Sequence, residues 1–149
     1  MKLPDVNLFL YAYDAGSPRH AAAIEWLERT LSGAETVGLP WAVPLSFIRL
    51  STRPVFMEQP YGVDEAVKIV EGWLEQPCVT VIAPTRRHAP ILRELLAPLG
   101  TGGNLTSDAH LAALSIEHGA TMLSCDNDFS RFRGLRWEDP LSATQTPKS

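Results

Sequence analysis

Residues 104–129 read NLTSDAHLAALSIEHGATMLSCDNDF, and this stretch decides the fold class. Thr106 or Ser107 can cap a helix that continues to His118, and Gly119 is a typical residue for its C-terminal stop. The small and apolar residues of this helix recur at helical spacing, which suits close packing on a sheet. A strand is expected directly afterwards, at residues 121–124. The stretch therefore predicts a helix packed against the strand that follows it.

The rest of the chain repeats this alternation of helix and strand. A short buried strand is expected at residues 2–3, with residues 6–13 forming the turn after it. We expect helices at residues 18–31, 41–52, 63–75 and 86–96, a strand or extended link at 36–39, a buried strand at 79–83 and a short strand at 135–137. Alternating strands and helices predict an α/β protein, a three-layer α/β/α sandwich with a mainly parallel central sheet. Residues 1–141 are expected to form one domain, and residues 142–149 a polar, disordered tail.

Composition limits the functional classes. The chain has 149 residues, 45% of them hydrophobic, and a formal net charge of −4. Strongly basic nucleic-acid binders carry a net positive charge, unlike this chain. RNA binding would therefore need a local basic patch or metal ions that offset the acidic residues. No apolar run approaches the roughly 20 residues that span a bilayer, so we expect no membrane association and a cytoplasmic protein. The two cysteines, Cys78 and Cys125, match no metal or redox spacing.

Four aspartates fall where a parallel α/β fold places its ligands. Asp5 follows the first expected strand, Asp126 and Asp128 follow the strand at 121–124, and Asp108 lies in the first turn of the helix before it. In parallel sheets, ligands bind beyond the carboxyl ends of the strands. These aspartates can therefore converge at one edge of the sheet.

A cluster of carboxylates points to a hard divalent cation. Carboxylates that lie close together repel one another, and they stay ionised only with positive charge among them. Oxygen ligands suit Mg²⁺ or Mn²⁺, and such an ion can polarise a phosphoryl oxygen and activate water. Each aspartate alone can also be a helix-capping charge or part of a solvated turn. Neither explanation fits Asp5 as well, because burying an aspartate between Leu3 and Val6 costs free energy unless its carboxylate has a functional role.

Several segments, taken in order, resemble the PIN-domain family, and specifically its VapC-type toxins. They are Asp5-Val6-Asn7, residues 104–108 followed by Ala109, Leu111, Ala112 and Ala113, residues 116–120, residues 124–129, and the ending Phe132, Gly134, Leu135, Arg136, Trp137, Pro140, Leu141. Residues 124–129 are similar to the family's Thr-x-Asp-x-Asp-Phe. The resemblance covers nearly the whole chain.

The resemblance implies a Mg²⁺- or Mn²⁺-dependent endoribonuclease that cuts tRNA, rRNA or mRNA, arrests growth and is silenced by a cognate antitoxin. Such toxins usually form homodimers. By position, Asp5, Asp108 and Asp126 would be catalytic metal ligands, and Asp128 an outer ligand or organiser of the site. Asn7 would orient Asp5 through a hydrogen bond.

One position departs from the family. Its second helix usually carries a glutamate three residues before an arginine, and here Ser46 stands at that place before Arg49. A serine cannot supply the charge, although its hydroxyl could hold a water on the metal. The number of bound ions, one or two, is therefore left open. This motivates an alternative, a catalytically weakened PIN module that binds RNA or an antitoxin without cleavage. A phosphohydrolase with a nucleophilic aspartate is a weaker alternative, because Asn7 replaces its usual second aspartate.

Arginines and aromatic residues suggest where RNA and protein partners could bind. Arg131 and Arg133, with Arg136, interleave with Phe129, Phe132 and Trp137, a pattern that suits phosphate contact and base stacking unless the aromatic residues are core. Arg49 is a second candidate for RNA contact. Candidates for an exposed antitoxin surface, unless they too are core, are Trp41, Phe47, Phe56, Met57 and Trp73. The four histidines have no ligand spacing, so we expect no zinc site.

Overall fold

A five-stranded parallel sheet runs through the middle of the molecule, in the order β3-β2-β1-β4-β5. The computed structural model describes residues 1–142. The strands are β1 (Lys2–Pro4), β2 (Val37–Leu39), β3 (Val79–Val81), β4 (Thr121–Leu123) and β5 (Trp137–Glu138). All strands are short, so the residues that position a site are expected to lie directly after the carboxyl ends of the strands.

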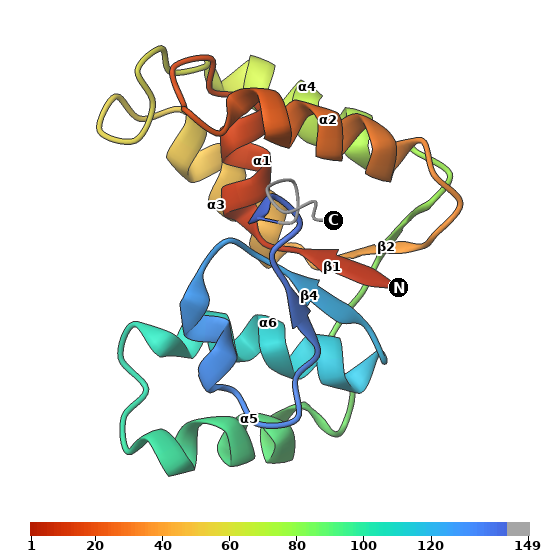
Figure 1. Ribbon diagram of the computed structural model, residues 1–149, viewed down its shortest axis with the longest axis vertical. Helices are drawn as coiled ribbons and strands as arrows, with labels where there is room; N and C mark the ends of the chain where they lie inside the picture. Colours follow the sequence, from red (N-terminus) through yellow and green to blue (C-terminus); the bar gives the residue numbers. More distant parts are fainter. Residues whose placement is uncertain (143–149) are drawn as a thin grey trace, which may run out of the picture.

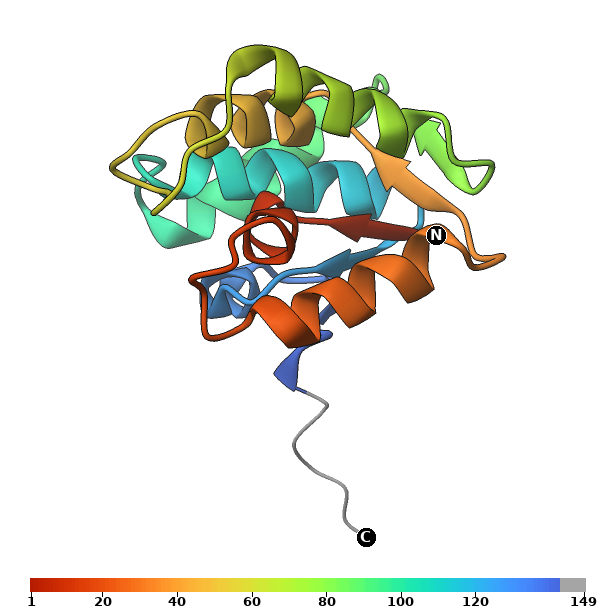
Figure 2. The same ribbon diagram turned by 90° about the horizontal axis from the view of Figure 1, so that it is seen from above.

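Helices cover both faces of the sheet. One layer holds α1 (Val6–Ala12), α2 (His20–Leu31), α3 (Ala42–Ser51) and α4 (Val63–Leu74), and the other holds α5 (His88–Leu96) and α6 (Leu105–Glu117) (Figure 1). Two short 3₁₀ helices, η1 (Ala97–Leu99) and η2 (Asn127–Arg131), follow α5 and β4. Figure 2 shows α2 and α6 on opposite sides of β1 and β4. The predicted three-layer sandwich with a parallel sheet is confirmed.

The order of the strands reverses at β1. From β1 the chain adds β2 and β3 on one side, and it then returns to add β4 and β5 on the other side. In open parallel sheets such a reversal leaves a crevice at the carboxyl ends of the two central strands. Pro4 is in register with Leu123, and the backbone N–H of Asp5 donates to the Leu123 carbonyl over 2.8 Å. The residues after β1 and β4 therefore begin side by side.

A cluster of aromatic rings from α1, α2, α3 and α4 packs together in the first helical layer. The Trp73 ring centroid lies 4.1 Å from that of Phe9 and 4.7 Å from that of Phe47, and all three side chains are fully buried. Met57 is buried as well. The interpretation of Phe47, Met57 and Trp73 as an exposed antitoxin surface was therefore wrong, because all three side chains are buried. Trp41 and Phe56 are exposed.

Three local predictions also fail. Residues 6–12 form helix α1 rather than a turn, because the Asp5 carboxylate accepts from the Val6 N–H and caps the helix. Strand β3 is largely exposed rather than buried, because it lies at the edge of the sheet. Helix α6 begins at Leu105, and neither Thr106 nor Ser107 is its cap. Gly119 does follow α6, in the left-handed conformation that its role as a stop requires (φ 65°).

The predicted tail lies outside the described residues except for Ser142, and the single-domain boundary at residue 141 stays a prediction. Within residues 1–142, no helix is long and apolar enough to cross a membrane. Cys78 and Cys125 are free thiols.

Candidate metal centre

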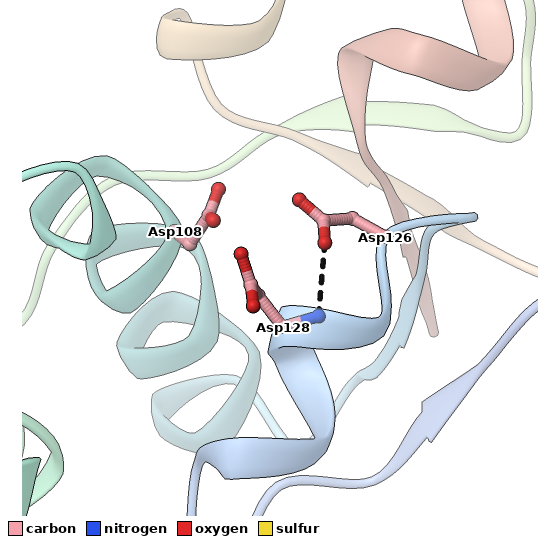
Figure 3. A group of neighbouring side chains, drawn as sticks. All are labelled: Asp108, Asp126 and Asp128. Atoms are coloured by element: carbon pink, nitrogen blue, oxygen red, sulfur yellow. Dashed lines mark hydrogen bonds between the residues drawn. The ribbon is translucent and has the colours of Figure 1, made fainter.

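Three aspartates converge at the carboxyl end of β4. Asp108, Asp126 and Asp128 each offer a carboxylate oxygen, and these oxygens lie within 4.8 Å of one another. Figure 3 shows the three side chains turned toward a common space between α6 and η2. The Asp126 carboxylate also accepts from the Asp128 N–H over 2.9 Å, which holds the first turn of η2 in place. The structure thus brings together three of the four aspartates singled out from the sequence.

Asp5 reaches the same site through Ser124. The fully buried Ser124 hydroxyl donates to the second carboxylate oxygen of Asp5 over 2.8 Å and accepts from the Asp126 N–H over 3.0 Å. The Asn7 amide also donates to this hydroxyl, over 3.3 Å, and among the described residues no hydrogen bond joins Asn7 directly to Asp5. The predicted bond from Asn7 to Asp5 is therefore replaced by an indirect one. Sequence analysis missed Ser124 as an organiser, although it stands directly after the strand that carries the acidic turn.

Burial and mutual repulsion disfavour the ionised forms of two of these carboxylates, those of Asp108 and Asp5. Burial, together with the nearby charges of Asp5, Asp126 and Asp128, raises the pKa of Asp108 to about 7. Burial also raises the pKa of Asp5 above its ordinary value, against the opposing hydrogen bonds from Ser124 and Val6, while Asp126 adds to the rise. A cation among these groups would favour their ionised forms.

A cavity of about 290 Å³ opens beside the carboxylates, between α3 and α6. Its walls include Asp5, Ser46, Asp108 and His110. Ser46 therefore faces the same space as two of the aspartates, at the position where a glutamate was expected. A larger hollow of about 430 Å³ lies between residues 13–16 and 58–65 and includes none of the four aspartates.

The residues predicted to contact RNA fall into two groups. Arg131 lies at the rim of the carboxylates, with its guanidinium 3.8 Å from Asp128, whereas Arg49 and Arg133 are exposed without an ion pair among the described residues. Phe129 and Phe132 are buried in the core, so the expectation that they stack on bases was wrong. Arg49, Arg131 and Arg133 remain candidates for contact with a phosphate.

The fold and the site together define a parallel α/β protein with a carboxylate centre at its topological switch point. The PIN-domain family profile matches residues 2–135. Ribonuclease VapC37 of Mycobacterium tuberculosis is 44% identical over 140 residues, which cover 94% of this chain and 97% of that protein. Ribonuclease VapC33 of the same organism is 40% identical over 141 residues, covering 95% of this chain and 99% of that protein.

A solved structure agrees with these matches. VapBC2 from Rickettsia felis, bound to a DNA fragment from its promoter, matches with a TM-score of 0.67 at 18% identity, over 92% of this chain and 96% of that chain. At this identity the likeness concerns the fold. The chain belongs to the PIN-domain family and, within it, to the VapC ribonucleases.

The raised pKa of Asp108 predicts a pH-dependent cost to the metal-free protein. Between pH 3.8 and about 7 the folded state binds more protons than the unfolded chain, so stability falls as the pH rises through this window. Asp108→Asn should remove this loss and raise the melting temperature of the metal-free protein by about 3–6 °C at pH 8, with a smaller gain at pH 5.

Thermal melts in chelator at both pH values measure this effect. Asp64→Asn, at an exposed aspartate on α4 that pairs with Lys68, is the matched control and should shift the melting temperature only slightly, and equally at both pH values. An equal gain from Asp108→Asn at both pH values would contradict the assignment.

Proposed function

We propose that this protein is a Mg²⁺- or Mn²⁺-dependent endoribonuclease, acting in the cytoplasm as the toxin of a toxin–antitoxin module. Its substrate is RNA (tRNA, rRNA or mRNA), and a cognate antitoxin silences it. The observation that carries the proposal is the convergence of Asp108, Asp126 and Asp128 within 4.8 Å, in a chain of the VapC ribonuclease family.

The donor set fits such an ion. Mg²⁺ binds oxygen at about 2.0–2.1 Å, so two oxygens on one ion lie at most about 4.2 Å apart. The oxygens of Asp108, Asp126 and Asp128 need only a small rearrangement to meet this limit. We assign these three as the residues that would hold the ion, with Asp5 as a further negative charge and ligand.

The remaining residues bind and orient the substrate. A bound ion would supply a polarised phosphoryl oxygen and an activated water. Arg131 can exchange its half-exposed ion pair with Asp128 for a substrate phosphate, because such a pair contributes about 0–1 kcal/mol. Ser46 would hold a water across the cavity. Because Ser46 carries no charge, the negative charge that would hold the ion lies on the Asp108 side of the cavity.

Protein partners are proposed on the first helical layer. Four exposed apolar residues lie here: Trp41 directly before α3, Leu45 on α3, and Val63 and Val67 on α4. The packing of α3 against α4 supports a shared surface for the antitoxin or for a second copy in a homodimer.

A second candidate function rests on Ser46. A PIN module that binds RNA or an antitoxin without cleavage would not need the charge that is missing there. This function would explain growth arrest that survives Asp5→Asn and Asp126→Asn without cut RNA.

Calorimetric titration with Mn²⁺, in metal-free buffer, tests the proposal. We expect the wild-type protein to bind Mn²⁺ and Asp5→Asn to bind it at least about tenfold more weakly, because the variant loses a buried charge beside the cluster. Asp64→Asn is again the control. RNA cleavage should require Mn²⁺ or Mg²⁺ and stop with chelator. Cleavage that persists without a divalent ion would reject the metal-dependent mechanism, and Mn²⁺ binding without any cleavage would favour the binding module.

A further inference from the structure

The cavity between α3 and α6 combines apolar walls with hydroxyl groups. Val43 and Leu111, both buried, line it together with the half-buried Ala42. Thr106 and Ser107, in the first turn of α6, are exposed and line it as well. Its volume of about 290 Å³ lies at the lower end of the range for ligand sites, which is roughly 300–1,000 Å³. The space therefore suits one small group with apolar faces and a polar edge.

This cavity adjoins the proposed ion site without coinciding with it. Asp5 and Asp108 line the cavity, whereas Asp126 and Asp128 do not. The carboxylates of Asp108, Asp126 and Asp128 instead meet in the space between α6 and η2 (Figure 3). Asp108 therefore borders both spaces, and the nucleotide beside an ion-bound phosphate would reach the cavity.

Charge decides which part of that nucleotide the cavity suits. The carboxylates of Asp5 and Asp108 border it, Ser46 is uncharged, and no described residue of its walls is an arginine or a lysine. Such walls disfavour a phosphate group, because their negative charge repels it. The base is the uncharged part of a nucleotide that has broad faces for stacking and a polar edge for hydrogen bonds. The cavity therefore matches a base better than it matches the backbone.

The imidazole of His110 adds a ring to the walls. Its Nδ1 lies 2.9 Å from Nε2 of His88 on α5, and the two ring centroids are 4.8 Å apart. This contact holds the His110 ring in place beside the cavity. Histidine rings stack on unpaired bases in RNA complexes, and stacking does not depend on which ring nitrogen carries a hydrogen.

We propose that this cavity binds one unpaired base of the RNA strand, in the nucleotide beside the phosphate that is cut. The base packs on the apolar walls and on His110, and the hydroxyls of Thr106 and Ser107 bond its polar edge. A hydroxyl both donates and accepts, so each of the four bases can be bonded there. A base must leave its stack to enter, which directs the enzyme to loops and single-stranded segments. The inference rests on the proposed function for its substrate class.

The test compares two labelled strands of equal length, a random-sequence RNA pool and an abasic ribose-phosphate strand, by fluorescence anisotropy with Ca²⁺ in place of Mn²⁺. The wild-type protein should bind the RNA pool at least about tenfold more tightly, because the abasic strand lacks the stacked base. Ala42→Leu, which fills the cavity, should lower the affinity for the RNA pool about tenfold and leave that for the abasic strand unchanged. Ala22→Leu on α2 is the matched control, because Ala22 is also partly buried against the core but lies outside the cavity.

Two further readouts locate the bound base. The backbone amide NMR signals of Val43 and Leu111 in the wild-type protein should shift with the RNA pool and not with the abasic strand. Calorimetry should find the wild-type Mn²⁺ affinity in Ala42→Leu, because the cavity is not the ion site.

Four results would each overturn the inference. They are equal affinity of the wild-type protein for the two strands, an equal loss for both strands in Ala42→Leu, unchanged RNA binding by that variant, and loss of its Mn²⁺ binding. Unchanged RNA binding would leave the cavity to a protein partner, and lost Mn²⁺ binding would assign it to the ion. Cleavage of the RNA pool in Mn²⁺ tests the proposed nuclease separately, because an uncleaved strand can still place a base in the cavity.

Discussion

Asp126→Asn is expected to lower the rate of RNA cleavage by about a thousandfold, which corresponds to several kcal/mol of transition-state stabilisation by a bound ion. The substitution removes one of three converging charges and keeps the shape of the side chain. An asparagine oxygen can still accept from the Asp128 N–H, so η2 should stay folded. Cleavage of labelled RNA under single-turnover conditions measures the loss.

Asp14→Asn is the matched control for this variant. The Asp14 carboxylate likewise accepts from a backbone N–H two residues further on, that of Gly16, over 3.1 Å, but it belongs to none of the candidate ligands. We expect its cleavage rate to match that of the wild-type protein. If Asp126→Asn cleaved RNA at the wild-type rate with an unchanged Mn²⁺ affinity, the carboxylate cluster would not be the catalytic centre.

Ser124→Ala is expected to weaken Mn²⁺ binding by about 10–100-fold, although the residue is not a proposed ligand. Its hydroxyl joins Asp5, Asp126 and Asn7 through three hydrogen bonds, and all three lose a partner in the variant. The unfolding free energy should also fall, by about 1–3 kcal/mol, because buried polar groups are left unpaired. Calorimetry and denaturant unfolding measure the two effects.

Ser115→Ala separates the role of this hydroxyl from that of any buried serine. Ser115 is equally buried, but the one partner of its hydroxyl within residues 1–142 is the sulfur of Met122, to which it donates over 3.5 Å. We expect this control to bind Mn²⁺ as the wild-type protein does. Equal losses of affinity in both variants would mean that Ser124 acts through general stability and does not orient the aspartates.

The sequence was informative about the fold where its periodicity was strong. The helix and strand of residues 104–124 were expected nearly as they occur, because helical spacing and a glycine stop act locally. Helix α1 was missed because its residues are apolar almost throughout, and an apolar run does not distinguish a strand and its turn from a buried helix. The exposure of β3 was missed because the place of a strand in the sheet is not local information.

The same limit applies to the site. Asp108, Asp126 and Asp128 could be predicted because a parallel sheet has a definite edge for ligands, and their convergence follows from chain order. The contact from Ser124 to Asp5 joins residues 119 positions apart, and that between His88 and His110 joins two helices whose relative rotation no spacing reveals. Side-chain partners of this kind depend on packing.

The position of β1 between β2 and β4 has a consequence for synthesis of the chain. Asp5 is made 119 residues before its partner Ser124, and before the proposed ligands Asp126 and Asp128. While residue 121 is still inside the exit tunnel of the ribosome, the part of the nascent chain that has emerged lacks β4. It also lacks two of the three converging carboxylates. The protein therefore cannot assemble its proposed ion-binding centre beside the RNA of the ribosome that makes it until β4 and the turn after it have left the exit tunnel.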